Sequence, residues 1–237
     1  MPRVVVLGCG TGVGKTRLSV ALLRQLRESG HHCMGLKPIE SGVDPGHGFP
    51  ARGSDAQAVA NAGSLPMTSS RHPLYALREP ISPHLAARRQ NEEISVEAVR
   101  DWVMSSEQAV TPLVSSDRAL WTVIESAGGV FSPLSAVATN FDLARALEPA
   151  IWVLVAADAL GVLHELSATL QAMRARHRMP DHVVLSCARP PDASTGSNTH
   201  ELTTLGIATP TAVLARDDDS GVGELVRRLL AETPSQR

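Results

Sequence analysis

The chain has 237 residues and a formal net charge of −2 at pH 7, so its charge gives no reason to expect binding to nucleic acid. Hydrophobic residues make up 43% of it but aromatic residues only 3%, which predicts an aliphatic core of the kind that parallel strands form beneath helices. No apolar run approaches the roughly 18 residues that a membrane span requires. The length suits one large α/β domain over residues 1–237.

The cysteines and the N-terminal residues bear on the cellular compartment in which the protein is expected. Cys9, Cys33 and Cys187 are far apart, odd in number and without C-x-x-C or zinc-finger spacing. We expect them to be small buried residues in a reducing cytoplasm. The apolar run at the N-terminus spans only about five residues, too few for the apolar region of a secretory signal. These features predict a cytoplasmic protein.

The first segment of the chain predicts a phosphate-binding loop. Residues 4–7 are apolar, as in a central parallel strand, and a helical pattern begins near Lys15. The glycines between them let backbone N–H groups approach phosphate oxygens, and the helix N-terminus adds partial positive charge. Lys15 can reach the β- and γ-phosphates of a nucleoside triphosphate, and the Thr16 hydroxyl can ligate Mg²⁺. The residues expected to bind the nucleotide are Thr11, Gly12, Val13, Gly14, Lys15 and Thr16.

The spacing of this loop departs from the pattern G-x-x-x-x-G-K-[ST]. That pattern requires glycine at the position of Cys9, and Gly8 comes one residue too early. The alternative is a glycine-rich connector with a chance lysine. The strand before the loop and the helix after it favour the phosphate-binding loop.

The next segment brings a second lysine toward the loop. A helix is expected over residues 15–29 and a strand over residues 32–36, which Pro38 ends. Lys37 therefore lies at the carboxyl end of a strand, where open α/β sheets bind ligands. The alternative for Lys37 is an ordinary solvated side chain.

Two further segments follow before the middle of the chain. Residues 43–53 are rich in glycine and proline and predict a loop beside the site, in which His47 is given no role. Ser54 is expected to cap a short helix that ends at Ala62. Asp55, in the first turn of that helix, could simply interact favourably with the helix dipole.

The rest of the chain continues to alternate strands and helices. Strands are expected near 74–77, 118–124, 151–156, 182–187 and 212–214, and helices near 95–114, 139–147, 198–205 and 221–232. Residues 79–87 are expected to form a turn entering a helix, and a further helix after residues 158–164 ends at about Arg176. This alternation predicts a doubly wound, mostly parallel α/β sheet with the phosphate loop after its first strand. Glu125 would then reach the same sheet edge, where it could complete a Mg²⁺ shell or remain merely solvated. Gly128 and Gly129 allow a tight turn or close approach to a substrate.

Four strings together resemble dethiobiotin synthetase. The phosphate loop is similar to the form G-T-x-T-x-V-G-K-T of that family, and three strings follow in matching order: K-P-I-E-S-G (37–42), E-P-I-S-P-H (79–84) and E-S-A-G-G (125–129). The resemblance covers residues 4 to about 205. It implies a ligase that uses ATP and Mg²⁺ to close a cyclic urea on 7,8-diaminononanoate with CO₂, through a carbamate and a phosphorylated carbamate.

The resemblance also implies roles for individual residues. Lys37 and Lys15 would act on the transferring phosphate, and Asp55 would join Thr16 and Glu125 as a Mg²⁺ ligand. Substrate contacts are implied for Ser41, Gly128, Gly129, Leu160 and Gly161. The loop at 160–161 in that family reaches substrate bound mainly by the neighbouring subunit, which implies a homodimer. His84 is either near the substrate or a capping or core histidine.

The chain departs from the family at several positions. Ser126 stands where the family has glycine, and Leu163 where it has asparagine. Family members commonly have Asn-Asp where this chain has Cys187-Ala188, so we expect weaker discrimination of the nucleotide base.

Two alternatives from other functional classes therefore remain open. One is a nucleotide-switch ATPase acting through a protein partner, which Gly10 disfavours because the partition ATPases carry a lysine there. The other is a degenerate nucleotide-binding relative without ligase activity.

Overall fold

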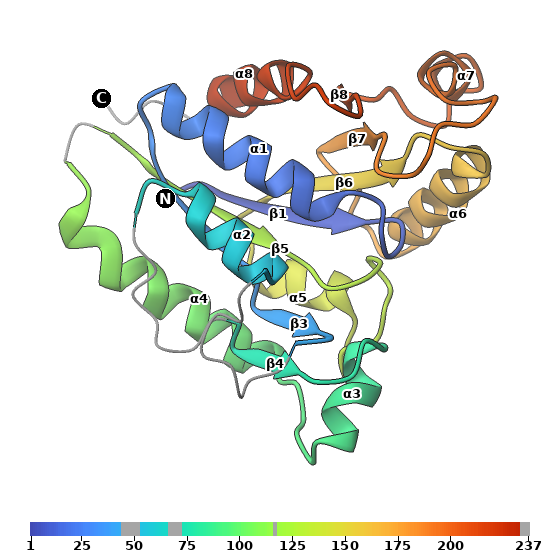
Figure 1. Cartoon of the computed structure of the whole chain (residues 1–237). Helices are drawn as coiled ribbons and strands as arrows, with labels where there is room; N and C mark the ends of the chain where they lie inside the picture. The colour runs from blue at the N-terminus through green and yellow to red at the C-terminus, as the bar shows by residue number, and fades with distance from the viewer. Residues whose placement is uncertain (44–52, 66–72, 116–117, 233–237) are drawn as a thin grey trace.

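The centre of the molecule is a six-stranded sheet whose strands are all parallel (Figure 1). The computed structural model describes residues 1–43, 53–65, 73–115 and 118–232. In spatial order the strands are β2 (His32–Leu36), β5 (Leu120–Glu125), β1 (Arg3–Gly8), β6 (Ile151–Ala157), β7 (His182–Ser186) and β8 (Ala212–Leu214). The chain crosses from one side of β1 to the other between β5 and β6, which is where such sheets bind ligands. The predicted doubly wound α/β sheet is confirmed.

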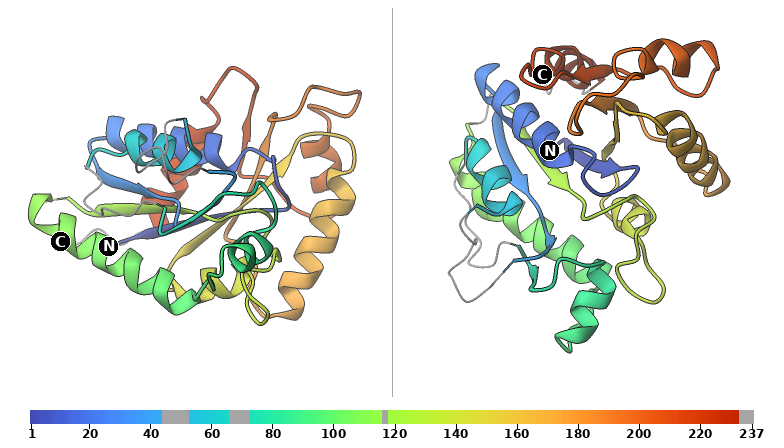
Figure 2. Two further views of the ribbon diagram at one scale, coloured as in Figure 1. Left: turned by 60° about the horizontal axis from the view of Figure 1, so that its bottom comes forward. Right: turned by 45° about the vertical axis from the view of Figure 1, so that its right-hand side comes forward.

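Helices cover both faces of this sheet (Figure 2). One face carries α1 (Lys15–Glu28), α2 (Asp55–Ala62) and α8 (Val222–Glu232), and the other carries α4 (Val96–Val110), α5 (Asn140–Ala146), α6 (Val162–Ala175) and α7 (Asn198–Thr204). Successive residues of a strand point to opposite faces. Val4 and Val6 therefore pack beneath α1, α2 and α8, whereas Val5 and Leu7 pack on the other face, beneath α4, α5, α6 and α7. The core is mainly aliphatic, as the composition predicts.

A second, smaller sheet was not predicted from the sequence. β3 (Ile39–Ser41) begins directly after Pro38 and pairs in parallel with β4 (Tyr75–Leu77), which α3 (Pro83–Arg89) follows. Proline has no N–H to continue the ladder of β2, so the chain leaves the large sheet there. The carbonyl of Pro38 instead accepts the Tyr75 N–H at 3.0 Å. Lys37 consequently lies at the corner between the two sheets.

Most predicted elements lie within a few residues of their observed bounds. The helix predicted over 95–114 ends earlier, at Val110, and continues as the 3₁₀ turn η2 (Thr111–Leu113). Pro112 explains the difference because it cannot donate the hydrogen bond that the α-helix needs. The expectation of three buried cysteines is wrong for Cys9 and Cys187, which are partly exposed, while Cys33 is buried. None of the described helices has the length and apolar character to cross a membrane.

Asn140 holds the segment between β5 and α5. Its side chain is fully buried, and its Nδ2 donates to the carbonyls of Ala127 at 2.5 Å and Gly129 at 2.9 Å. The N–H of Val130 bonds to the Gly8 carbonyl at 2.7 Å, which ties this segment to the end of β1. The loop after β5 is therefore fixed against the phosphate-binding loop.

We predict that Asn140→Ala lowers the free energy of unfolding by about 1–3 kcal/mol, because it removes the side-chain donor to the buried Ala127 carbonyl and one of the two donors to the Gly129 carbonyl. Urea unfolding followed by circular dichroism measures the change. Val137→Ala is the matched control, since Val137 is 93% exposed and its truncation should change stability by less than about 0.5 kcal/mol. Equal stability of the two variants would show that Asn140 does not hold the loop.

Candidate active site

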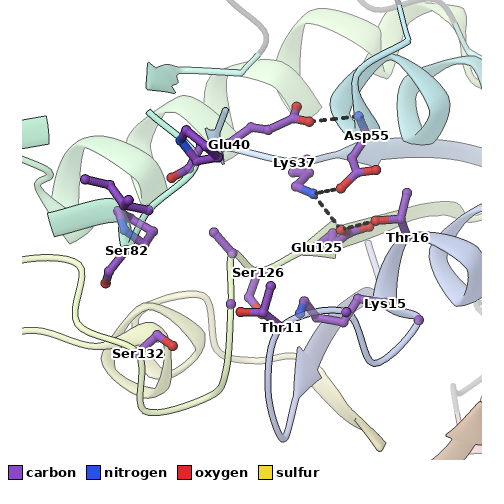
Figure 3. A pocket seen from close by; sticks show the side chains of 18 of the residues that line it. Thr11, Lys15, Thr16, Lys37, Glu40, Asp55, Ser82, Glu125, Ser126 and Ser132 are labelled. Atoms are coloured by element: carbon purple, nitrogen blue, oxygen red, sulfur yellow. Dashed lines mark hydrogen bonds and ion pairs between the residues drawn. The ribbon is translucent and has the colours of Figure 1, made fainter. Parts of the chain in front are cut away.

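A cavity of about 650 Å³ opens at the carboxyl ends of β1, β2 and β5 (Figure 3). Segments far apart in the sequence line it: the glycine-rich loop and the start of α1, the corner at Lys37, the start of α2, residues 80–83 before α3, and the loop after β5. A cavity of this volume is in the range of small-molecule sites. The sequence-predicted edge of the sheet is therefore the edge that carries the cavity.

The glycine-rich loop curls tightly around the Lys15 side chain. Gly12 and Gly14 have φ of 70° and 95°, a left-handed conformation that glycine adopts without strain. The Lys15 ammonium donates to the Gly10 carbonyl at 3.0 Å. A Cβ on Gly8 would lie 2.9 Å from the same carbonyl oxygen, so the close approach of the loop requires glycine at position 8. The irregular spacing thus still produces a closed loop.

Burial changes the acidity of Lys15. Its side chain is 7% exposed, and burial lowers its pKa to about 8, although Glu125 opposes the shift. Removal from water disfavours the ammonium form, and a nearby anion favours it. An arriving phosphate would therefore stabilise the charged form of Lys15.

The predicted nucleotide-binding residues do not all face the cavity. Thr11, Gly12, Gly14, Lys15 and Thr16 line it. Val13 does not, because its side chain is fully buried in the core beneath α1 and only its main chain belongs to the loop. Arg17 also lines the cavity and was missed, because it reads as an ordinary first-turn helix residue. Its guanidinium bonds to the Asp219 carboxylate at 2.8 Å.

Lys37 lies between two carboxylates. Its ammonium is 2.5 Å from Asp55 Oδ2 and 2.9 Å from Glu125 Oε1. β2 pairs with β5 so that Leu36 lies opposite Ile124, which places Lys37 beside Glu125. Burial lowers the pKa of Lys37, but the two carboxylates outweigh it and raise the pKa above its ordinary value. Burial likewise raises the pKa of Asp55, but Lys37 outweighs this and lowers it.

The residues predicted to hold Mg²⁺ lie together in this cluster. The Thr16 hydroxyl donates to Glu125 Oε1 at 2.7 Å, and Glu125 is 1% exposed. The other oxygen of Glu125, Oε2, is buried and has no hydrogen-bond partner among the described residues. A buried carboxylate oxygen of this kind is expected to have a partner, and hard oxygen donors suit Mg²⁺.

The same residues do not form a complete metal site by themselves. Within the described part of the chain there is no group of three or more His, Cys, Asp and Glu side chains that could hold a metal. Two carboxylates and the Thr16 hydroxyl would need phosphate oxygens and water as further ligands, which is how Mg²⁺ commonly binds with nucleotides. The residues present therefore fit Mg²⁺ that arrives with a nucleotide.

Glu40 is a functional candidate that the sequence analysis missed. It lines the cavity, is 6% exposed, and accepts the N–H groups of Asp55 at 2.8 Å and Ala56 at 3.0 Å. Burial raises the pKa of Glu40, and Lys37 offsets part of the shift. The K-P-I-E-S-G string places Glu40 next to the site, but nothing in that string indicates its partners at the start of α2.

Hydroxyl groups also line the cavity. Ser82 and Ser132, which were missed, lie across it from Lys15 and Lys37 (Figure 3). Ser41 lines the cavity too, and its Oγ is buried without a hydrogen-bond partner among the described residues. Gly128 is a lining residue, but Gly129 is not; the Gly129 N–H donates to Ser132 Oγ at 2.9 Å. These groups can bind a substrate that donates or accepts hydrogen bonds.

The structure does not bring every predicted residue to this cavity. Leu160 and Gly161, at the N-terminus of α6, are not among the residues that line it, and Leu160 is 81% exposed. The Nδ1 atom of His84 lies 2.9 Å from Ser82 Oγ, so His84 contacts a cavity residue without lining the cavity. His47 lies outside the described residues.

The departures from the family pattern are accommodated locally. The Ser126 hydroxyl donates to the Val6 carbonyl at 3.0 Å, and its backbone does not adopt the left-handed conformation that would require glycine. Ala188 lines the cavity, and the Cys187 thiol lies 3.8 Å from Asp158 Oδ2. The expected weak discrimination of the nucleotide base stays a prediction.

Solved structures with a similar fold include proteins from Aquifex aeolicus and Elizabethkingia anophelis. The MinC:MinD cell division protein complex of Aquifex aeolicus aligns with a TM-score of 0.51 at 13% identity, over 100% of this chain and 99% of the other. The signal recognition particle receptor FtsY from Elizabethkingia anophelis aligns with a TM-score of 0.54 at 12% identity, over 96% of this chain and 65% of the other. Likeness at these identities establishes the fold alone.

Sequence comparisons identify the family, which likeness in fold does not. Residues 2–225 match a family model described as an AAA domain. The ATP-dependent dethiobiotin synthetase of Caulobacter sp. (strain K31) is 35% identical over 186 residues, which cover 78% of this chain and 76% of the relative. That of Anaeromyxobacter sp. (strain K) is 33% identical over 220 residues, covering 92% of each chain. With the loop, the two lysines and the carboxylates gathered around one cavity, the chain belongs to the ATP-dependent dethiobiotin synthetase family.

Proposed function

We propose that this chain closes the cyclic urea of dethiobiotin from 7,8-diaminononanoate and CO₂ at the expense of ATP. The observation that carries the proposal is the convergence of Lys15, Lys37, Thr16, Asp55 and Glu125 on one side of a cavity whose other side bears serine hydroxyls. The first set suits a metal-bound triphosphate and the second a polar organic substrate. Family membership over most of the chain supports the same activity.

The chemistry needs positioning more than it needs a protein nucleophile. One amine of the substrate adds to CO₂, forming a C–N bond and releasing a proton to give a carbamate. The carbamate is a poor electrophile, so the γ-phosphoryl group moves to its oxygen and ADP leaves. The second amine then attacks the carbonyl carbon, the bond to phosphate breaks, and the ring closes. Phosphoryl transfer of this kind depends on positioning and charge stabilisation.

The residues of the chain divide this work. The N–H groups of the glycine-rich loop and Lys15 hold the phosphates, and Lys37 offsets negative charge as the γ-phosphoryl group moves. Thr16, Asp55 and Glu125 would hold Mg²⁺. That ion, when bound, neutralises charge on the phosphate oxygens. Ser41, Ser82, Ser132 and the Gly128 backbone would orient the substrate.

Two alternative functions receive less support. A nucleotide switch acting through a protein partner agrees with the fold, but the likeness to MinC:MinD is at 13% identity, and Gly10 stands where the partition ATPases have a lysine. A degenerate relative without ligase activity is disfavoured because Lys15 and Lys37 both line the cavity together with two carboxylates. Lys37 is in contact with both of those carboxylates. The reaction proposed above uses each of these groups.

Assembly and compartment belong to the same proposal. The exposed Leu160 and Gly161, away from the cavity of their own chain, support a homodimer in which they reach the substrate of the partner. Three free cysteines and the use of ATP support a cytoplasmic location. The net charge of −2 supports small-molecule substrates rather than nucleic acid.

The direct test measures dethiobiotin and phosphate together. We expect phosphate release from ATP to require both diaminononanoate and bicarbonate, with one dethiobiotin formed per phosphate. Release that responds only to a protein partner would support the switch. Nucleotide binding without any turnover would support the degenerate relative.

A second prediction concerns Lys37, whose charge acts mainly when the phosphoryl group moves. Lys37→Met should lower kcat about a hundredfold or more, because it removes a cation from the transferring oxygens. The Kd for ATP should change by less than about fivefold, because the loop still binds the phosphates. Arg17→Met is the matched control, since it removes a cation that lines the cavity away from the two carboxylates. A kcat equal to that of the control would remove Lys37 from catalysis.

A third prediction concerns pH and Lys15. In the free protein its pKa is about 8, below its ordinary value, and a bound triphosphate would raise it again. Nucleotide binding should therefore take up about half a proton at pH 8, and affinity should fall as pH rises above about 8. Calorimetry in buffers of different ionisation enthalpy measures the uptake. Lys15→Arg should abolish it because arginine stays charged; uptake that persists in this variant would assign the proton to another group.

A further inference from the structure

Glu40 makes an unusual contact for a buried carboxylate. It lies on β3, in the short segment that also carries Lys37, and both of its oxygens are bonded to the main chain at the start of α2 (Figure 3). Oε1 accepts the Asp55 N–H at 2.8 Å and Oε2 accepts the Ala56 N–H at 3.0 Å. These charge-assisted bonds and the positive end of the helix dipole offset the cost of burying the charge.

Helix capping alone does not explain this arrangement. Ser54 already caps α2, because its hydroxyl accepts the Gln57 N–H at 3.1 Å. The N–H groups of the first two helical residues are usually satisfied by water at an exposed helix start. Glu40 therefore adds something beyond the cap, namely a fixed connection between β3 and the residue that carries the Asp55 carboxylate.

The Asp55 side chain is not held by close packing, because it is 51% exposed. Its carboxylate nevertheless lies 2.5 Å from the Lys37 ammonium, 18 residues earlier in the chain. Two bonds to the main chain at Asp55 and Ala56 restrict where that carboxylate can lie relative to Thr16 and Glu125.

We propose that Glu40 is a positioning residue, which fixes Asp55 so that it can ligate the Mg²⁺ that arrives with the nucleotide. This inference rests on the proposed function of the site. Partners that orient metal ligands without touching the metal typically change metal affinity 10- to 100-fold when they are lost. Glu40 would be such a partner, because it bonds to the main chain of Asp55 and would not touch the ion itself.

The experiment measures Mn²⁺ binding to the protein at limiting ATP by water proton relaxation, which protein-bound Mn²⁺ enhances more than Mn²⁺ on free ATP does, without any need for turnover. Glu40→Gln keeps the shape of the side chain but turns an amide N–H₂ toward one of the two backbone donors. We expect it to weaken Mn²⁺ binding about tenfold, approaching the effect of Asp55→Asn, which removes a ligand charge. Glu40→Ala should weaken it at least as much.

Ser54→Ala is the matched control, because it removes the other cap of α2 without touching Asp55 or Ala56. It should lower the thermal unfolding midpoint yet leave Mn²⁺ affinity within about twofold. The proposal is overturned if Glu40→Gln binds Mn²⁺ as the wild type does, or if Ser54→Ala weakens binding equally. Specific weakening in Glu40→Gln while the wild type forms no dethiobiotin would support the positioning role and contradict the proposed reaction.

Discussion

The parallel pairing of β2, β5 and β1 is the constraint on which the rest of the site depends. Leu36 lies opposite Ile124, and Val6 lies opposite Glu125, so three chain segments leave the sheet side by side. Because parallel strands place all their carboxyl ends at one edge, the pairing brings together the lysine after β2, the carboxylate at the end of β5 and the loop after β1. Pro38 and Asn140 then fix where two of these segments go.

The pKa shifts in the cavity follow from the burial of charged side chains. Lys37 balances the charge of one of its two neighbouring carboxylates, whereas at Lys15 burial outweighs the attraction of Glu125 and lowers the pKa. A metal-bound triphosphate brings what both groups lack, a cation near the carboxylates and anions near the lysines. Binding would therefore exchange internal ion pairs for contacts with the ligand. Such an exchange would let side chains that pair with one another also bind a highly charged nucleotide.

The fold by itself does not decide between a ligase and a switch, because the same sheet occurs in the similar structures of MinC:MinD and FtsY. The choice between these two functions rests on the side chains that line the cavity at the carboxyl edge of the sheet. Serine hydroxyls line the cavity beside the lysines and carboxylates, where a second, organic substrate would contact them in the proposed reaction. The local accommodation of Ser126 shows that a changed residue in this loop need not change its course.

The metal role of Asp55 came from the family resemblance. The order of residues by itself determined the alternation of strands and helices, the phosphate-binding loop, and Lys37 and Glu125 at the sheet edge. These features depend on short-range spacing, which the order of residues records directly. Only the tertiary structure decided that a strand follows Pro38, that the side chain of Val13 is buried in the core, and that Glu40 bonds to the start of α2. Each of these features depends on contacts between segments that are distant in the sequence. The spacing of apolar residues predicts a helix or a strand, but it does not say which segments will be neighbours in the folded chain.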